Sequence, residues 1–287
     1  NIFTQTASNM RGYILETIES YLKITTPEDI EKTFNNVCGL LKGAMDKESA
    51  DAANNSNNKP QLTATLLDII VTMVGYLPAN CYGALFMIFD QTVNSSDTLI
   101  QKRAYRIISK LSEISLGEEA IANYLGEIET ILLRNSNSVH TSARSGRLSA
   151  IKTVVNLLPL DHMSFIVHIS AEIILATKDV NEKTRDLAFE ILILMAQRMS
   201  NGGSIDMGEG NVQLASLGEF FKIVSAGLIG ESQHMVSSTI TAFACLVFEF
   251  RESLSPDIVV DVYDTVELYL TSNSREIAKS AIGFAKV

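Results

Sequence analysis

The stretch that decides the fold is TKDVNEKTRDLAFEILILM, residues Thr177 to Met195. A short polar turn precedes a run in which apolar residues return every three or four positions, which is the spacing of one buried helix face. Ala188 lies in the middle of that face, where a small residue is expected if two helix backbones approach closely. Arg185 lies beside the turn, on the polar side. The predicted buried face consists of Thr184, Ala188, Ile191, Leu192 and Met195.

The same pattern, an apolar residue or Thr followed four positions later by a small one, recurs along the chain. Its other occurrences begin at Ile100, Val139, Ile277 and, more loosely, Val236. They are separated by roughly 40 to 50 residues, with room for two helices in each interval, which is typical of HEAT or armadillo repeats. We therefore predict an all-α fold, an α-α superhelix (a HEAT/armadillo-like solenoid) of about six helical pairs. In such an array Arg185 would pair with Asp179 or with an acid of the next repeat, or would contact a ligand directly.

Helical periodicity covers nearly the whole sequence, with two interruptions. The predicted helices are residues 8–24, 27–47, 60–77, 79–94, 97–114, 117–134, 138–158, 161–176, 179–200, 212–229, 232–251, 254–271 and 273–286. The polar stretch at about 46–61 is expected to be a mobile loop, and the Gly-rich stretch at about 200–213 a flexible insertion. Because the helical pattern resumes after each, residues 1–287 are predicted to form a single repeat array. The chain begins without Met and ends inside a predicted helix, so we expect a fragment of a longer chain.

Composition limits the classes of function. The formal net charge of -10 argues against a chain that mainly coats nucleic acid and favours basic partners. The three cysteines, Cys38, Cys81 and Cys245, are far apart among apolar residues, as expected of buried, reduced thiols. The longest apolar run, residues 66–77, contains Asp68 and is too short to span a bilayer.

The sequence lacks the common motifs of catalytic, nucleotide-binding and metal-binding sites. It has no phosphate-binding loop, no dinucleotide fingerprint in the right context, no nucleophile elbow and no zinc-protease motif. Its Cys and His residues show no metal-ligand spacing. We therefore predict a protein that is not an enzyme, with no catalytic residues, no metal and no cofactor.

One constellation is a candidate binding site. Second helices of a HEAT array line its concave surface, so basic residues on successive second helices could form a positive ridge that binds phosphates or an acidic partner. The alternative is a solvated face neutralised by nearby Asp and Glu. Tyr105 is the one aromatic residue among these cations, so nucleic-acid contact would be through the backbone rather than by base stacking. The candidate ridge consists of Lys102, Arg103, Arg106, Lys110, Arg144, Arg147, Lys152, Lys183 and Arg185.

Particular residues also carry a family resemblance. The segment Leu158 to Leu192, with LPLDH followed by TKDVNEKTRDLAF, resembles the ribosomal RNA-processing protein 12 family. Gly218 to Phe250 and Asn273 to Val287 resemble the same family in the same order. The likeness is clearest over residues 100–287.

The resemblance implies a HEAT-repeat scaffold for ribosome biogenesis. It implies binding to pre-ribosomal particles through assembly factors, ribosomal proteins and pre-rRNA backbone, and support of rRNA processing and nuclear export of subunits. Nuclear transport machinery is a further implied partner, and a membrane is not. The implied location is the nucleolus and nucleus, with shuttling to the cytoplasm left open. Two alternatives remain: an importin-type nuclear transport receptor, and a regulatory scaffold subunit of a phosphatase or kinase.

Overall fold

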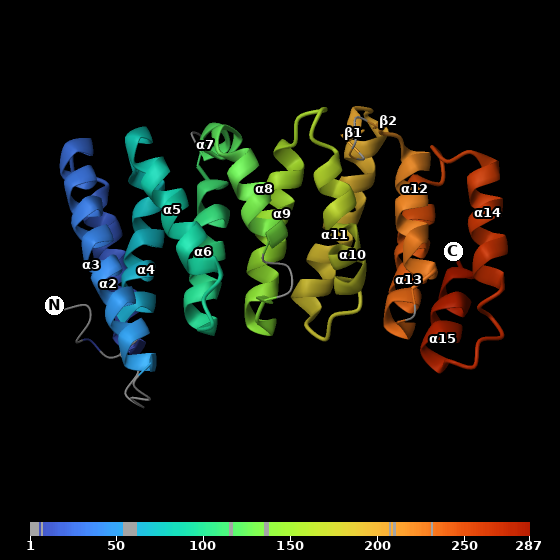
Figure 1. Cartoon of the computed structure of the whole chain (residues 1–287), viewed down its shortest axis with the longest axis horizontal. Helices are drawn as coiled ribbons and strands as arrows, with labels where there is room; N and C mark the ends of the chain where they lie inside the picture. The colour runs from blue at the N-terminus through green and yellow to red at the C-terminus, as the bar shows by residue number, and fades with distance from the viewer. Residues whose placement is uncertain are drawn as a thin grey trace. The chain divides into compact units, whose positions relative to one another are not determined.

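A computed structural model describes residues 6, 8–53, 62–114, 117–134, 138–206, 208, 211–230 and 232–287. The chain forms two compact units, Asn1–Ala150 and Ile151–Val287. Within each unit, helices run side by side with their chain neighbours (Figure 1). The described strands are confined to one short hairpin.

The first unit is built from helices that cover one another's apolar faces. Helix α4 packs against α2, α3 and α6, and α6 also packs against α5, α7 and the short helix η5. Phe34, Leu67, Phe89 and Ile108 are fully buried between these helices. The elements are η1 (Ser8–Met10), α2 (Arg11–Leu22), α3 (Pro27–Ala53), α4 (Leu62–Met73), η2 (Val74–Tyr76), η3 (Ala79–Cys81), α5 (Tyr82–Val93), α6 (Thr98–Leu111), α7 (Gly117–Asn123), α8 (Leu125–Arg134), η5 (Thr141–Ala143) and α9 (Arg144–Leu157), which ends in the second unit.

The second unit repeats the arrangement. Helix α10 packs against α11, α12 against α13 and α14 against α15, while α13 also packs against α10, α11 and α15. The predicted buried face of α11, including Ala188, is buried throughout. The elements are α10 (Ser164–Ala176), α11 (Glu182–Ser200), β1 (Ser204–Asp206), β2 (Val212–Leu214), α12 (Leu217–Ser225), η6 (Ala226–Leu228), α13 (Gln233–Phe250), α14 (Pro256–Glu267) and α15 (Arg275–Phe284).

These pairings confirm the predicted all-α solenoid. Four occurrences of the recurring pattern lie in α6, α11, α13 and α15, and the one at Val139 leads through η5 into α9. Each of these is the second helix of its pair. The small residue of the pattern is buried at the close approach, as Ala104, Ala143, Ala188 and Ala281 show.

Side-chain caps begin several of these helices. The Asp97 carboxylate accepts from the backbone N–H of Leu99 at 2.8 Å and of Ile100 at 3.2 Å, at the start of α6. Asn181 caps α11 by accepting from the N–H of Thr184. Such caps satisfy N–H groups that the first helical turn leaves without an intrahelical acceptor. The local sequence therefore sets where each helix begins.

The structure corrects three predicted boundaries. Helix α3 continues to Ala53, so residues 46–53 are helical, and residues 54–61 of the expected loop lie outside the described residues. The helix predicted at 117–134 is interrupted at Tyr124, between α7 and α8. The helix predicted from residue 212 begins at Leu217, because residues 212–214 form β2. No helix among the described residues is long and apolar enough to cross a bilayer.

Candidate partner-binding site

Helix α6 presents the clearest part of the predicted ridge. Lys102 and Arg106, one turn apart, are both exposed. The opposite face of α6, with Ala104, Ile107 and Ile108, is fully buried. No ion pair within the described residues involves Lys102 or Arg106. These two cations are therefore available to an anionic partner.

Two other cations of α6 are held by acids of the same unit. Arg103 Nε donates to Asp68 on α4 at 2.7 Å, and the side chains are 21% and 14% exposed. Lys110 Nζ lies 2.7 Å from a Glu113 carboxylate oxygen, with both side chains more exposed. The Arg103 pair joins two packed helices, so its charge is neutralised in place. The Lys110 pair is a surface pair and contributes little to stability.

Arg147 is not part of an exposed ridge, and that prediction is wrong. It lies in α9 with only 1% of its surface exposed. Its guanidinium donates to the carbonyl oxygen of Leu132 in α8 at 2.8 Å and to the hydroxyl of Tyr105 in α6 at 3.3 Å. Tyr105 is itself fully buried, so it offers no surface for base stacking. Arg147 is a structural residue that ties α6, α8 and α9 together.

The remaining ridge cations have different environments. Arg144 is exposed at the start of α9, and Lys183 is exposed in the first turn of α11. Lys152 Nζ lies 2.7 Å from Glu190 of α11. Arg185 donates to the backbone carbonyls of Asp179 at 2.9 Å and Val180 at 3.1 Å. Arg185 therefore fastens the turn before its own helix through backbone carbonyls, and its predicted pairing with an acid stays a prediction.

A ridge continuous over successive repeats stays a prediction. Within the first unit, the exposed cations Lys102 and Arg106 support it. Arg103 and Arg147 are committed to contacts inside that unit. Whether a cation is exposed or held inside the unit depends on where it lies around its helix. The helical period of 3.6 residues does not predict this position, because the exact start of the period is uncertain in the sequence.

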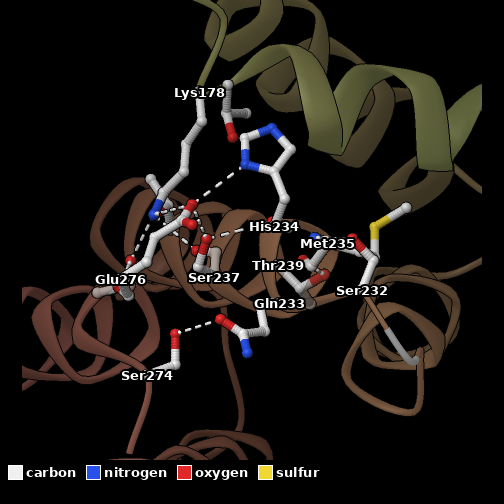
Figure 2. A network of polar contacts seen from close by, with 12 residues as sticks. Lys178, Ser232, Gln233, His234, Met235, Ser237, Thr239, Ser274 and Glu276 are labelled. Atoms are coloured by element: carbon white, nitrogen blue, oxygen red, sulfur yellow. Dashed lines mark hydrogen bonds and ion pairs between the residues drawn. The ribbon is translucent and has the colours of Figure 1, made fainter.

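A polar cluster in the second unit was not predicted (Figure 2). One Glu276 carboxylate oxygen accepts from the Ser237 hydroxyl at 2.6 Å and lies 3.1 Å from His234 Nδ1. Lys178 Nζ lies 3.7 Å from the same oxygen and donates to the Ser280 hydroxyl at 2.6 Å. The hydrogen bonds from Ser237 and His234, with the positive charge of Lys178, lower the pKa of the Glu276 carboxyl. The cluster joins the α10–α11 turn to α13 and α15.

The cluster contains Ser, His and a carboxylate but does not have the geometry of a catalytic triad. The Ser237 hydroxyl donates to Glu276 rather than to the His234 ring, so the imidazole is not placed to act as the base of a triad. Ser237 is also fully buried. Burial lowers the pKa of Lys178, and the nearby Glu276 opposes this effect. Within the described residues, no group of His, Cys, Asp and Glu is placed to hold a metal ion.

Comparisons with known proteins identify relatives. No protein-family model matches the chain. It is 59% identical over 295 aligned residues to "Ribosomal RNA-processing protein 12" of Saccharomyces cerevisiae, and the alignment covers 100% of this chain and 24% of the relative. It is 28% identical over 279 aligned residues to "RRP12-like protein" of Homo sapiens, and that alignment covers 96% of this chain and 20% of the relative. The chain thus spans about a fifth to a quarter of the length of the curated relatives it matches.

Solved structures are similar only at a low level. A designed armadillo repeat protein in complex with the peptide (KR)4 has a TM-score of 0.43 and 10% identity, covering 87% of this chain and 98% of that one. This likeness is too low to bear on function, and the solenoid assignment depends on the helix pairs described above. Sequence identity over the whole chain identifies its kinship: the chain belongs to the ribosomal RNA-processing protein 12 family.

Proposed function

We propose that the chain is a non-catalytic HEAT-repeat scaffold in ribosome biogenesis. It binds pre-ribosomal particles, through assembly factors, ribosomal proteins and the pre-rRNA backbone, and supports rRNA processing and nuclear export of subunits. Its proposed location is the nucleolus and nucleus, where it meets the nuclear transport machinery. The observation that carries the proposal is the 59% identity, over the whole chain, to a yeast protein named for ribosomal RNA processing.

The fold supports binding rather than catalysis. Stacked helical pairs bury their apolar faces against one another and leave long outer surfaces for partners. The Ser237–His234–Glu276 cluster is occupied with structural hydrogen bonds. An extended surface is suited to a large particle, which offers many weak contacts at once.

Lys102 and Arg106 are the proposed contacts to phosphate. They are exposed one turn apart on α6, on a chain whose net charge is -10. A local pair of cations can contact a nucleic-acid backbone even on a protein whose net charge is negative. Such contacts position a protein on its target and carry no sequence information, and they weaken as salt rises.

The test uses the full-length protein with both cations reversed, Lys102→Glu and Arg106→Glu. Co-sedimentation with pre-ribosomal particles is measured at several salt concentrations. We expect the bound fraction to fall severalfold and the dependence on salt to become shallower by about two ion contacts. The matched control reverses Lys42 and Lys47, which are exposed on α3 of the same unit. Equal association of the two variants at physiological salt would reject the α6 face as a contact.

The same material separates the two alternative functions. An importin-type receptor would capture a GTP-loaded small GTPase, and a regulatory scaffold subunit would co-purify with a phosphatase or kinase catalytic subunit. We expect pre-ribosomal particles to be the main co-purifying species. Recovery of the GTPase or of a catalytic subunit without particles would reject the proposed scaffold role.

A further inference from the structure

The hairpin between α11 and α12 has one edge closed by the protein. Strands β1 and β2 pair antiparallel, with Ser204 opposite Leu214 and Asp206 opposite Val212. On the outer side of β1, the N–H of Ser204 donates to the Leu160 carbonyl oxygen at 2.7 Å. The N–H of Asp206 donates to the Ser164 hydroxyl at 2.8 Å. Strand β1 is thereby fastened to the connection before α10.

A glycine makes this attachment possible. Gly203, which immediately precedes β1, has a φ of 115°, a conformation that other residues rarely adopt. A side chain at this position would also collide with the Leu160 carbonyl oxygen. The hairpin is therefore held in one place on the second unit by hydrogen bonds from the backbone of β1.

The other edge of the hairpin, along β2, is open. The N–H of Ala215 donates to the Gly203 carbonyl at 2.9 Å, so these two residues form a hydrogen-bonded pair of the ladder. Such pairs alternate along an antiparallel ladder, which makes Ile205 and Gln213 the next one. The backbone groups of Val212 and Leu214 consequently point away from β1. Among the described residues, no other group bonds to them.

Two exposed aliphatic side chains lie along this open edge. Val212 is 60% exposed and Leu214 is 81% exposed. They are two residues apart in a strand, so they lie on the same face of the hairpin. Ile205 lies on the opposite face and is fully buried against the unit. The hairpin therefore covers the helices with one face. On its solvent face Val212 and Leu214 of β2 lie opposite Asp206 and Ser204 of β1, so the aliphatic side chains lie along the open row of hydrogen-bonding groups.

The geometry points to β2 as a docking edge for an extended, basic segment of a partner protein, with apolar residues at alternate positions. Only an extended chain can pair with outward N–H and C=O groups, since a helix uses its own backbone groups internally. Alternate apolar residues would lie over Val212 and Leu214. The charge of the segment follows from the net charge of -10 and from exposed Asp161 and Asp206 around the hairpin. This inference goes beyond the scaffold role and does not depend on the ribosomal partners proposed above.

The probe is a synthetic peptide of alternating lysine and valine. Amide hydrogen exchange of the full chain is measured with and without it. In the free chain, the amides of Val212 and Leu214 should exchange fast and that of Gln213 slowly. On adding peptide, Val212 and Leu214 should become protected by about tenfold or more. No protection, or equal protection of the exposed helix faces, would overturn the inference.

Two methylated peptides show whether backbone pairing is responsible. Directly opposed residues share a face, so antiparallel addition uses the N–H groups of the valines and parallel addition uses those of the lysines. One of the two peptides, N-methylated at every valine or at every lysine, should therefore fail to bind while the other binds normally. Equal binding of both peptides, or equal loss, would contradict strand addition.

Variants of the chain test the two aliphatic side chains of β2. Replacing Val212 and Leu214 together by Thr keeps good strand formers but removes apolar surface, and should weaken peptide binding by about tenfold. The matched control is Val180→Thr, which changes a valine that is 88% exposed in the turn before α11. Binding that is unchanged in the double variant, or reduced as much in the control, would overturn the inference.

Discussion

Replacing the buried Arg147 by Met should destabilise the fold, although both side chains fill a similar space. Met keeps the apolar stem but has no N–H groups, so the Leu132 carbonyl loses a donor at 2.8 Å and the Tyr105 hydroxyl loses one at 3.3 Å. A hydrogen bond to a charged group contributes about 1.5–3 kcal/mol, and a carbonyl left buried without a donor costs a similar amount. Removing a buried charge recovers part of this loss. The expected loss in unfolding free energy is therefore about 2–4 kcal/mol.

The assay is urea unfolding of the chain, followed by far-ultraviolet circular dichroism, with Arg106→Met as the matched control. Arg106 is exposed on α6, so its replacement should change stability by less than about 0.5 kcal/mol. Arg147→Lys, which keeps the charge but loses the forked donor geometry, should fall between the two. If Arg147→Met is as stable as Arg106→Met, Arg147 does not tie the helices together, and the reasoning from its contacts is refuted.

Further predictions concern α11 and the cluster in Figure 2. Ala188→Leu should lower the unfolding free energy by about 1–3 kcal/mol, since Ala188 is fully buried; an unchanged melting temperature would contradict close packing there. Glu276→Gln should lower stability at neutral pH, because the pKa of the Glu276 carboxyl is lowered in the folded state and its ionised form is the stabilised one. That contribution is present above the ordinary pKa of 4.5 and is lost as the pH falls below it, so wild type and variant should converge in acid. Parallel stability curves from neutral to acid pH would refute this.

The sequence was most informative where a signal is local. A repeating small residue, such as Ala104 and Ala188, marks where second helices lie. The hairpin residues 204–214 gave no such signal, because strands of three residues are too short to show alternation. Helix α3 extends to Ala53, beyond its predicted end at residue 47. A polar stretch rich in Ala is compatible with a helix as well as with a loop, so the sequence did not show where the helix ends.

The candidate site was the least predictable part, for a related reason. Arg103, Arg106 and Arg147 are the same residue type on predicted second helices, yet one is paired with an acid, one is exposed and one is buried. The environment of a side chain is set by contacts with residues about one repeat away. Gln101 accepts a hydrogen bond from the backbone N–H of His140, and Ser237 donates one to Glu276, each across 39 residues of chain. Without the spacing of the helices, no local pattern identifies such partners.

By itself, the sequence determined the class of fold, the period of its helical pairs and the kinship of the chain, since these depend on residue order along a helix face. Only the tertiary structure decided which cations are exposed to solvent and which edge of the hairpin stays open. It also decided that the Glu276 carboxylate contacts Ser237, His234 and Lys178. Those outcomes depend on which side chains face each other after the pairs stack. Stacking brings together residues that are distant in the chain, and the exposure and electrostatic environment of each side chain depend on those neighbours.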